Sequence, residues 1–295
     1  QFAVDLKTKC DDEWILHSLR KRISSVVHNP RVAEASVLVD DLIKSHKLQD
    51  LSWVVSATDL NVTDEILSQT SMIITVGGDG TILRAVRLAA PNEIPILAVN
   101  MGRVGFMTEL AVDEVLKEIP SYLNGNPRVE ERMMLQMILE SDLSEVETLE
   151  VHALNDVVLG RGLFPTLLDI DVSISGVPLA TYRSDGVIVA TSSGSTGYAL
   201  AAGGLVMHPE LEGVLVQPLA AHIGFQTGVI APGDSIVTMR LKGDQEAVIS
   251  IDGLTHTNIG YHNKVTIVRS QYIARFLRLG ESPDFYSTLK NRLGD

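Results

Sequence analysis

Short apolar runs alternate with segments of helical periodicity over about the first 120 residues. Each apolar run has the length of a buried strand, and each intervening segment repeats its apolar residues at the spacing of an amphipathic helix. This alternation favours a parallel sheet with helices on both faces, a doubly wound α/β nucleotide-binding domain that we place at residues 1–128. The expected strands are Ile23–His28, Leu51–Ser56, Met72–Val76 and Ile94–Val99, and the expected helices are Val32–His46, Thr63–Gln69 and Ile82–Ala90.

The pattern changes near Val129 to short β-rich segments separated by turn residues. One helix, beginning near Ser195, interrupts them, so residues 129–270 are expected to form a mostly β domain. We expect residues 271–295 to return to the first domain as an apolar segment, Tyr272–Leu279, and a helix, Asp284–Leu293. The expected β-rich segments are Met134–Leu139, Glu150–Leu159, Leu168–Ile174, Thr181–Thr191, Ser235–Arg240, Ala247–Ile251 and Lys264–Arg269.

Composition narrows the range of partners. The 295 residues include 24 Lys and Arg against 37 Asp and Glu, a net charge of −13, which disfavours binding to nucleic acid or to an anionic membrane. Cys10 is the single cysteine, so no intramolecular disulfide can form, and the cytoplasm is the expected compartment. No apolar run reaches the roughly 18–20 residues that a membrane-spanning helix needs.

The stretch Gly77-Gly78-Asp79-Gly80-Thr81 joins a buried strand to a helix. At this position α/β folds expose backbone N–H groups to ligands, and glycines let an anion approach them closely. Thr81 is a possible helix cap. Asp79 is unusual there because a phosphate would repel its carboxylate, so we expect it to accept a proton from an attacking hydroxyl or to hold Mg²⁺ against phosphates.

Another interpretation of this stretch is a tight turn in which Asp79 bonds only to local backbone N–H groups. The P-loop lysine pattern is missing, so ATP, if it binds, would rely on backbone amides, Mg²⁺ and other cations. The Gly78-x-Gly80 spacing also differs from the dinucleotide fingerprint, which disfavours a hydride-transferring Rossmann enzyme.

A second group of polar residues lies in the β-rich part. In the stretch from Arg183 to Tyr198 a strand meets a Ser/Gly turn and a helix start, where Ser195 or Thr196 is a natural N-cap. Asp185 has Arg183 nearby to balance its charge and suits ribose hydroxyls or a carboxamide. A simple cap and a surface ion pair would explain the same residues.

Two further pairs of residues need a structural explanation. Asn155-Asp156 interrupts an apolar run within an expected strand, so its polar groups need buried backbone or a ligand as partners. Asp252-Gly253 has the composition of a hairpin turn.

Taken together, these motifs resemble the ATP-NAD kinase family over about residues 22–279. The glycine loop alone is shared with diacylglycerol kinase, sphingosine kinase and phosphofructokinase relatives, and the ordered set is more specific. The matching motifs are Gly77-Gly78-Asp79-Gly80-Thr81, Asn100-Met101-Gly102-Arg103-Val104-Gly105-Phe106, Asn155-Asp156, Arg183 through Tyr198 to Gly203-Gly204, and Asp252-Gly253.

The resemblance implies phosphorylation of the adenosine-ribose 2′-hydroxyl of NAD to NADP, with ATP as donor and Mg²⁺ or another divalent cation neutralising charge. On this basis Asp79 is the catalytic proton acceptor. The resemblance also implies a homodimer or homotetramer in which a neighbouring subunit helps to complete the site. The implied ATP-phosphate ligands are Gly77, Gly78, Gly80 and Thr81, and the implied NAD ligands are Asp79, Gly80, Asn155, Asp156, Arg183, Asp185, Thr196, Gly197, Tyr198, Ala199, Leu200 and Ala201.

Three positions depart from the family pattern. Gly197 replaces the usual alanine before Tyr198, Leu254 replaces a glutamine found in many members, and Gln226 follows Phe225 where an arginine is common. These changes concern substrate affinity and the choice between NAD and NADH more than the chemistry. Two alternatives to NAD kinase activity are a lipid kinase acting on diacylglycerol or a sphingoid base, and a non-catalytic NAD(P)-binding regulator.

Overall fold

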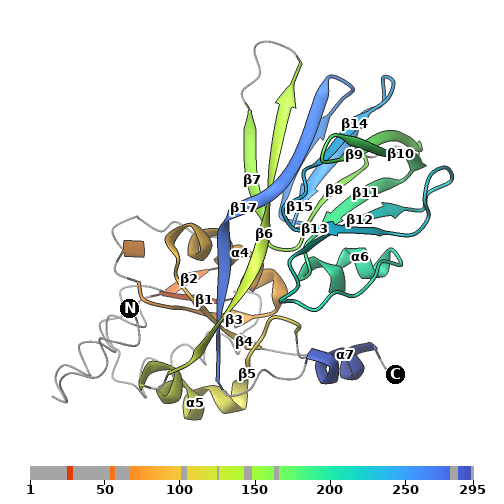
Figure 1. The fold of residues 1–295 in the computed structure, drawn as a ribbon. Coiled ribbons are helices and arrows are strands. Elements are labelled where there is room, and N and C mark those ends of the chain that lie inside the picture. Colours follow the sequence, from red (N-terminus) through yellow and green to blue (C-terminus); the bar gives the residue numbers. More distant parts are fainter. Residues whose placement is uncertain are drawn as a thin grey trace. The chain divides into compact units, whose positions relative to one another are not determined.

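The computed structural model describes residues 25–28, 54–56, 67–68, 70–100, 105–124, 126–142, 148–162, 166–279 and 285–293. The chain divides into unit 1, which joins Gln1–Glu131 to Ala274–Asp295, and unit 2, Arg132–Ile273 (Figure 1). The expected helix Val32–His46 lies outside the described residues, as do most of Thr63–Gln69 and residues 101–104 of the second motif.

Unit 1 contains a parallel sheet with the strand order β4-β3-β1-β2. The chain steps from β1 outward to β2, returns past β1 to β3, and then continues to β4 on the other side. The direction therefore reverses between β1 and β3, and ligands bind in α/β sheets beside such a reversal. The strands are β1 Ser25–His28, β2 Val54–Ser56, β3 Ile73–Gly77 and β4 Ile96–Asn100, and the two-residue β5 Leu110–Ala111 pairs with β4.

The helices of unit 1 differ from expectation in two places. Helix α4 spans Asp79–Ala89 and so begins at Asp79 rather than at Ile82. The glycines do not prevent the helix from starting at Asp79, because the N–H groups of a first helical turn have no intrahelical partners. Helix α5, Val112–Asn124, was not expected. Helix α7, Phe285–Leu293, nearly matches its prediction. A short 3₁₀ turn at Ala90–Asn92 follows α4 and contains Pro91.

A buried ion network connects the ends of β6 and β17 in unit 1. The Arg278 guanidinium donates to Glu130 at 3.0 Å and to Glu109 at 3.0 Å, and the three side chains are only 3–7% exposed. Tyr122 donates to the Glu109 carboxylate at 2.8 Å, as does the Leu279 N–H at 3.0 Å. Every charge in the network therefore has a partner, which buried charges require.

Unit 2 is built from antiparallel strands. One sheet has the order β13-β12-β11-β8-β15-β16, and the strands β10, β9, β14 and β17 form a second row in which β17 also pairs with β6. The bounds are β6 Arg128–Ser141, β7 Leu149–Ala153, β8 Asp156–Arg161, β9 Leu168–Ile174, β10 Val177–Ser184, β11 Gly186–Ala190, β12 Gly213–Leu219, β13 Val229–Pro232, β14 Val237–Leu241, β15 Ala247–Ile251, β16 Thr255–Ile259 and β17 Asn263–Arg278.

The core of unit 2 lies between these two rows of strands. Val157 and Leu159 of β8 pack there together with Ile170 of β9 and Tyr182 of β10. Val158, between them in sequence, faces the opposite side of the sheet and packs in a smaller cluster with Ala199. This alternation follows from the two-residue period of a strand, and it covers both faces of β8.

The predicted fold class, a doubly wound α/β domain followed by a mostly β domain, is confirmed. Several strand predictions were wrong in detail. Glu150–Leu159 is two strands, β7 and β8, separated at Leu154 and Asn155, and Thr181–Thr191 is divided into β10 and β11 at Asp185. Strand β17 is continuous where a break near residue 270 was expected, and β12, β13 and β16 were not predicted.

Removing Arg278 should destabilise unit 1. The change Arg278→Met leaves Glu109 buried without its cation and Glu130 with only the partly exposed Arg128, 3.6 Å away, which costs about 3–5 kcal/mol of unfolding free energy. Arg275→Met on the same strand is the control, because its partner Glu131 is 54% exposed and such pairs contribute at most about 1 kcal/mol. Chemical denaturation of both variants is the measurement, and equal losses would contradict a special role for the buried network.

Candidate active site

The glycine loop lies at the carboxyl end of β3, beside the reversal of strand order. Strand β3 ends at Gly77 and α4 begins at Asp79, while Gly78 and Gly80 are exposed. The first N–H groups of α4 have no preceding turn to accept their bonds, and the helix dipole is positive at this end. The loop therefore offers an exposed surface that attracts anions, interrupted by one carboxylate.

The expected cap at Thr81 is wrong. The N-cap of α4 is Gly78, which makes no side-chain capping bond, and Thr81 lies inside the first turn with only 4% of its surface exposed. Its N–H donates to the Gly78 carbonyl at 2.9 Å. Thr81 thus packs the turn against the core and leaves the exposed end of the helix to the glycines.

Two segments from elsewhere in unit 1 contact the Asp79 carboxylate. A Cβ added at Gly105 would collide with Asp79 Oδ1, so a larger residue there would force the carboxylate to move. The Gly105 N–H donates to Thr108 Oγ1 at 3.1 Å, which fixes the loop locally. From α7, Arg292 places a guanidinium nitrogen 3.9 Å from Asp79 Oδ2. The glycine of the second motif and a residue that the sequence did not single out therefore both lie beside Asp79.

In unit 2, Asp252 organises the backbone around Asn155 and Asp156. Its carboxylate accepts the N–H groups of Leu154 at 2.9 Å, Asn155 at 2.7 Å and Asp156 at 3.1 Å. The residue lies in the hairpin turn between β15 and β16, as predicted, with φ at 51°. Charged acceptors bind backbone N–H groups strongly, so this turn fixes the link between β7 and β8.

The end of β11 holds the same link from the other side. Thr191 Oγ1 donates to the Leu154 carbonyl at 2.6 Å, and the Thr191 N–H donates to the Asn155 carbonyl at 2.9 Å. Gly194 lies so close to Asn155 that an added Cβ would collide with its carbonyl oxygen. Thr191 and Gly194, from the stretch between Arg183 and Tyr198, are therefore assembled with Asn155, Asp156 and Asp252 into one cluster.

Ser195 and Thr196 do not cap a helix as expected. Gly194–Thr196 form a 3₁₀ turn, and the short helix α6, Tyr198–Ala201, has Gly197 as its N-cap with no side-chain bond. The fully buried Ser195 instead donates to the Ser192 carbonyl at 2.7 Å and accepts the Met207 N–H at 2.9 Å. Its hydroxyl therefore holds the following loop in place, and Thr196 remains half-buried beside it.

Asn155 and Asp156 differ in how their polar groups are satisfied. Asn155 Oδ1 is buried and has no hydrogen-bond partner among the described residues. Asp156 is 6% exposed, and burial together with the nearby Asp252 carboxylate raises its pKa to about 7. Buried polar groups normally have a hydrogen-bond partner, so the open acceptor of Asn155 gives the cluster a feature of a binding site.

Arg183 and Asp185 lie apart from this cluster. Strand β8 pairs with β11 so that Asp156 faces Ala190 and Gly160 faces Gly186, which puts Asp185 five residues along the strands from Asp156, roughly 17 Å away. The cation balancing Asp185 is Arg161, at 3.1 Å, rather than Arg183. The sequence did not identify Arg161, because it comes from a neighbouring strand.

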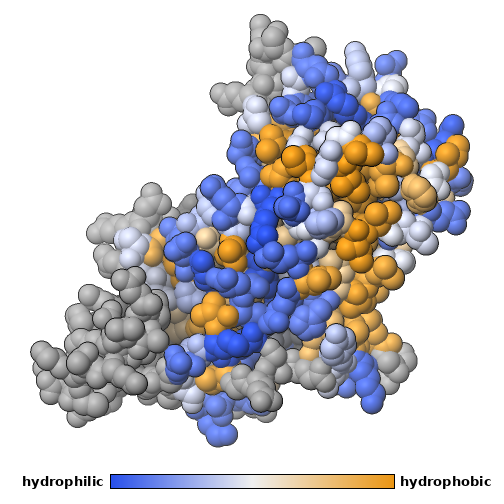
Figure 2. All heavy atoms as spheres, in the orientation of Figure 1, coloured by the Kyte–Doolittle hydropathy of each residue, from blue (hydrophilic) through white to orange (hydrophobic). Residues whose placement is uncertain are grey.

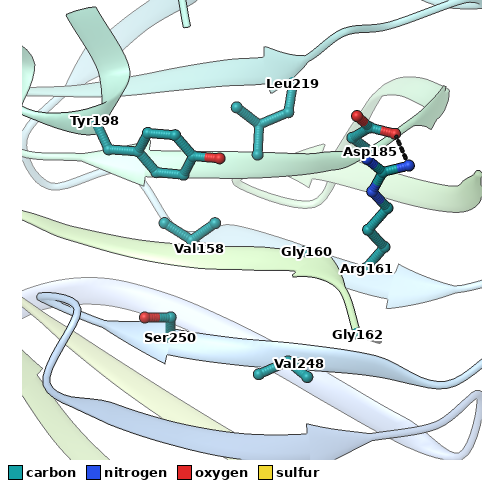
Figure 3. Close-up of a pocket in the computed structure, with 9 residues that line it drawn as sticks. All are labelled: Val158, Gly160, Arg161, Gly162, Asp185, Tyr198, Leu219, Val248 and Ser250. Atoms are coloured by element: carbon teal, nitrogen blue, oxygen red, sulfur yellow. Dashed lines mark ion pairs between the residues drawn. The ribbon is translucent and has the colours of Figure 1, made fainter. Parts of the chain in front are cut away.

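A surface cavity of about 340 Å³ lies at this second position. Figure 3 shows the Arg161–Asp185 ion pair at one side and the Tyr198 ring extending over the sheet from α6. Leu219 and Val158 form apolar walls beside the ring, and Ser250 adds a hydroxyl on the neighbouring strand. The cavity thus combines an aromatic ring, apolar walls and a paired carboxylate.

Among the described residues, no group of three or more His, Cys, Asp or Glu side chains could hold a metal by itself. Asp79 is a carboxylate beside an exposed helix N-terminus, and Mg²⁺ is commonly bound by one or two carboxylates together with substrate phosphates. The donor set is therefore suited to a metal ion that arrives with a nucleotide. No helix in the described parts of the chain is long and apolar enough to cross a membrane.

Comparisons with known proteins cover both units. The family model for the ATP-NAD kinase N-terminal domain matches residues 12–126, and that for the ATP-NAD kinase C-terminal domain matches residues 154–279. The chain is 33% identical over 274 residues to an NAD kinase of Dehalococcoides mccartyi, covering 92% of this chain and 96% of the relative. It is 35% identical over 278 residues to an NAD kinase of Chloroflexus aurantiacus, covering 91% and 97%.

Two solved structures share the fold. One is yeast NADH kinase complexed with NADH, with a TM-score of 0.80 and 21% identity over 92% of this chain and 87% of that chain. The other is an NAD kinase from Archaeoglobus fulgidus in complex with ATP, with a TM-score of 0.71 and 26% identity over 92% of this chain and 98% of that chain.

The raised pKa of Asp156 predicts a pH-dependent stability. Its folded-state pKa, about 7, is above the ordinary value of 3.8, so its contribution to stability is complete below about pH 4 and is lost as the pH rises through 7. The stability of Asp156→Asn relative to that of the unmodified protein should therefore increase by about 1 kcal/mol or more when the pH is raised from 5 to 8. Denaturant unfolding at both pH values measures the difference, and parallel pH profiles would contradict it.

Proposed function

This chain belongs to the ATP-NAD kinase family, and we propose that it catalyses the family's reaction with Asp79 as the base. Asp79 accepts the proton of the adenosine-ribose 2′-hydroxyl of NAD. The ribose oxygen bonds to the γ-phosphorus of ATP while the bond to the β–γ bridging oxygen breaks, so that NADP and ADP result. The observation that carries the proposal is a partly exposed carboxylate at the N-terminus of α4, where an anion would otherwise bind unopposed.

We propose that Gly77, Gly78 and Gly80 border the donor phosphates. The exposure of Gly78 and Gly80 and the open N–H groups of α4 support this role, since such helix ends bind phosphate through backbone donors. Thr81 contributes by packing the first turn, because its side chain is buried. Mg²⁺ would be held by the ATP phosphates with Asp79 as the nearby carboxylate, and it would neutralise phosphate charge.

NAD is proposed to bind unit 2 through Asn155 and Asp156, with Thr196, Gly197, Tyr198, Ala199, Leu200 and Ala201 bordering it. The buried Oδ1 of Asn155 can accept a ribose hydroxyl or an amino group. The Asp156 carboxyl, with a pKa near 7, can accept or donate a hydrogen bond at neutral pH. The backbone bonds from Asp252 and Thr191 hold both residues in position, which favours binding because little ordering remains to be done.

Arg183 and Asp185 are proposed to contact a dinucleotide at the second position, together with Tyr198. Because Asp185 is roughly 17 Å along the strands from Asp156, we propose that this position serves NAD held mainly by a neighbouring copy in a homo-oligomer. Figure 2 shows apolar side chains gathered on the flank of unit 2 that carries β12, β13 and α6, and Leu205, Leu211 and Ile230 are exposed in these parts. Exposed apolar patches commonly mark association surfaces.

Purified protein with ATP, Mg²⁺ and NAD should produce NADP, and Asp79→Asn should abolish this product. The amide cannot take the ribose proton, whereas NAD binding should persist because Asn155 and Asp156 are unchanged. NADP formation is followed enzymatically, and NAD affinity is followed by calorimetry. Full activity in the variant would show that another group is the base, and an inactive unmodified protein would favour a non-catalytic NAD(P)-binding regulator.

Replacing Asn155 should affect binding more than chemistry. Asn155→Ala removes the buried acceptor and should raise KM for NAD about tenfold, with kcat at saturation changed less than about threefold. Asn258→Ala, an exposed position on β16, is the matched control and should leave both constants unchanged. An unchanged KM in the Asn155 variant would exclude the proposed contact.

A further inference from the structure

The last turn of α7 brings a cation to the reacting carboxylate. Arg292 lies one residue before the end of the helix, and its guanidinium is 3.9 Å from Asp79 Oδ2. The side chains of Arg292 and Asp79 are 32% and 34% exposed, so both can be reached by a ligand. These residues are far apart in sequence and meet only because both segments belong to unit 1.

The contact contributes little to folding. A separation of 3.9 Å is too long for a hydrogen bond, and a partly exposed ion pair of this kind contributes at most about 1 kcal/mol. Helix α7 itself has no buried residue. The position of Arg292 therefore needs an explanation other than stability.

Phe106 holds the guanidinium without using its hydrogen-bond donors. The Arg292 Cζ atom lies 4.5 Å from the centre of the Phe106 ring, within the range of a cation–π interaction. Phe285, at the start of α7, packs on the same ring with the centroids 6.3 Å apart. Within the described residues, the Arg292 N–H groups donate no hydrogen bond. The guanidinium is thus held at its face, and its planar edge remains available to an acceptor.

The chemistry at Asp79 requires such a cation. The donor phosphates and the Asp79 carboxylate would repel one another, and the loop carries no P-loop lysine. Phosphoryl transfer relies on cations that neutralise the charge on the equatorial oxygens of the transferred group. Arginine suits this task because its planar donors match the geometry of phosphate oxygens and its charge is permanent.

We propose that Arg292 is a catalytic residue that donates hydrogen bonds to the γ-phosphoryl group during its transfer. This inference rests on the proposed function. As the ribose 2′-oxygen bonds to phosphorus and ADP departs with the electron pair of the broken bond, the proton passes to Asp79 and Arg292 binds the equatorial oxygens.

The test compares substitutions on one helix. Arg292→Met keeps the length and apolar character of the side chain and should lower kcat about 100-fold or more, with KM for NAD changed less than about threefold. Arg292→Lys keeps the charge without the planar fork and should lose at least about tenfold. Lys290→Met removes a neighbouring exposed charge from the same last turn and should keep full kcat.

Rescue and pH dependence separate direct contact from an effect through Asp79. Added guanidinium ion should restore part of the kcat of Arg292→Met, because it can occupy the vacated position beside Phe106. The loss should persist at all pH values tested. Recovery by raising the pH alone would overturn the proposal, since Arg292 would then act only by keeping Asp79 ionised.

Other outcomes are also decisive. Unchanged kcat in Arg292→Met overturns the inference while NADP formation by the unmodified protein still supports the proposed function. Absence of NADP from the unmodified protein instead rejects the proposed function itself. If circular dichroism shows that Arg292→Met is unfolded, the folded Arg292→Lys variant decides, with a tenfold loss supporting the inference and full activity overturning it.

Discussion

The placement of a carboxylate at the end of a helix that attracts anions is the constraint on which the proposed phosphate site of unit 1 depends. Asp79 begins α4, where the partial positive charge of the helix and its open N–H groups favour anions. The carboxylate remains there because the surrounding chain gives it close neighbours of suitable size and charge. Gly105 leaves room for its oxygen, and Arg292 lies beside it. The proposed base for a sugar hydroxyl and the proposed phosphate site thus share the same end of one strand.

In unit 2, hydrogen bonds hold the irregular link between strands β7 and β8 in one conformation. Asp252 and Thr191 approach the backbone of residues 154–156 from two sides and satisfy its polar groups. The buried Oδ1 of Asn155 is then left without a hydrogen-bond partner among the described residues, and the Asp156 carboxyl lies buried beside it. The backbone bonds therefore supply rigidity, and the side chains are the groups for which we propose a role in recognition.

The sequence predicted the fold class and the motifs because both depend on local patterns. Strand β3, the glycine loop and the Asp252 hairpin follow from periodicity and turn chemistry within a few residues. Strand boundaries at Asn155 and Asp185 were missed because apolar residues continue on both sides of the break. The partners Arg161 and Arg292 could not be found, since each meets its aspartate only through the pairing of distant segments. Capping at Thr81 and Ser195 was wrong because both side chains are buried by tertiary packing.

The division of the chain has a consequence for the order of synthesis. Unit 2 is an insertion within unit 1, entered at Arg132 and left at Ala274, inside strands β6 and β17 rather than at loops. Domains fold as units while the ribosome extends the chain. Unit 2 can accordingly form first, whereas the surroundings of Asp79 are complete only after α7 has emerged. In a partly synthesised chain, the cluster around Asn155 and Asp156 can therefore be complete before the surroundings of Asp79 are.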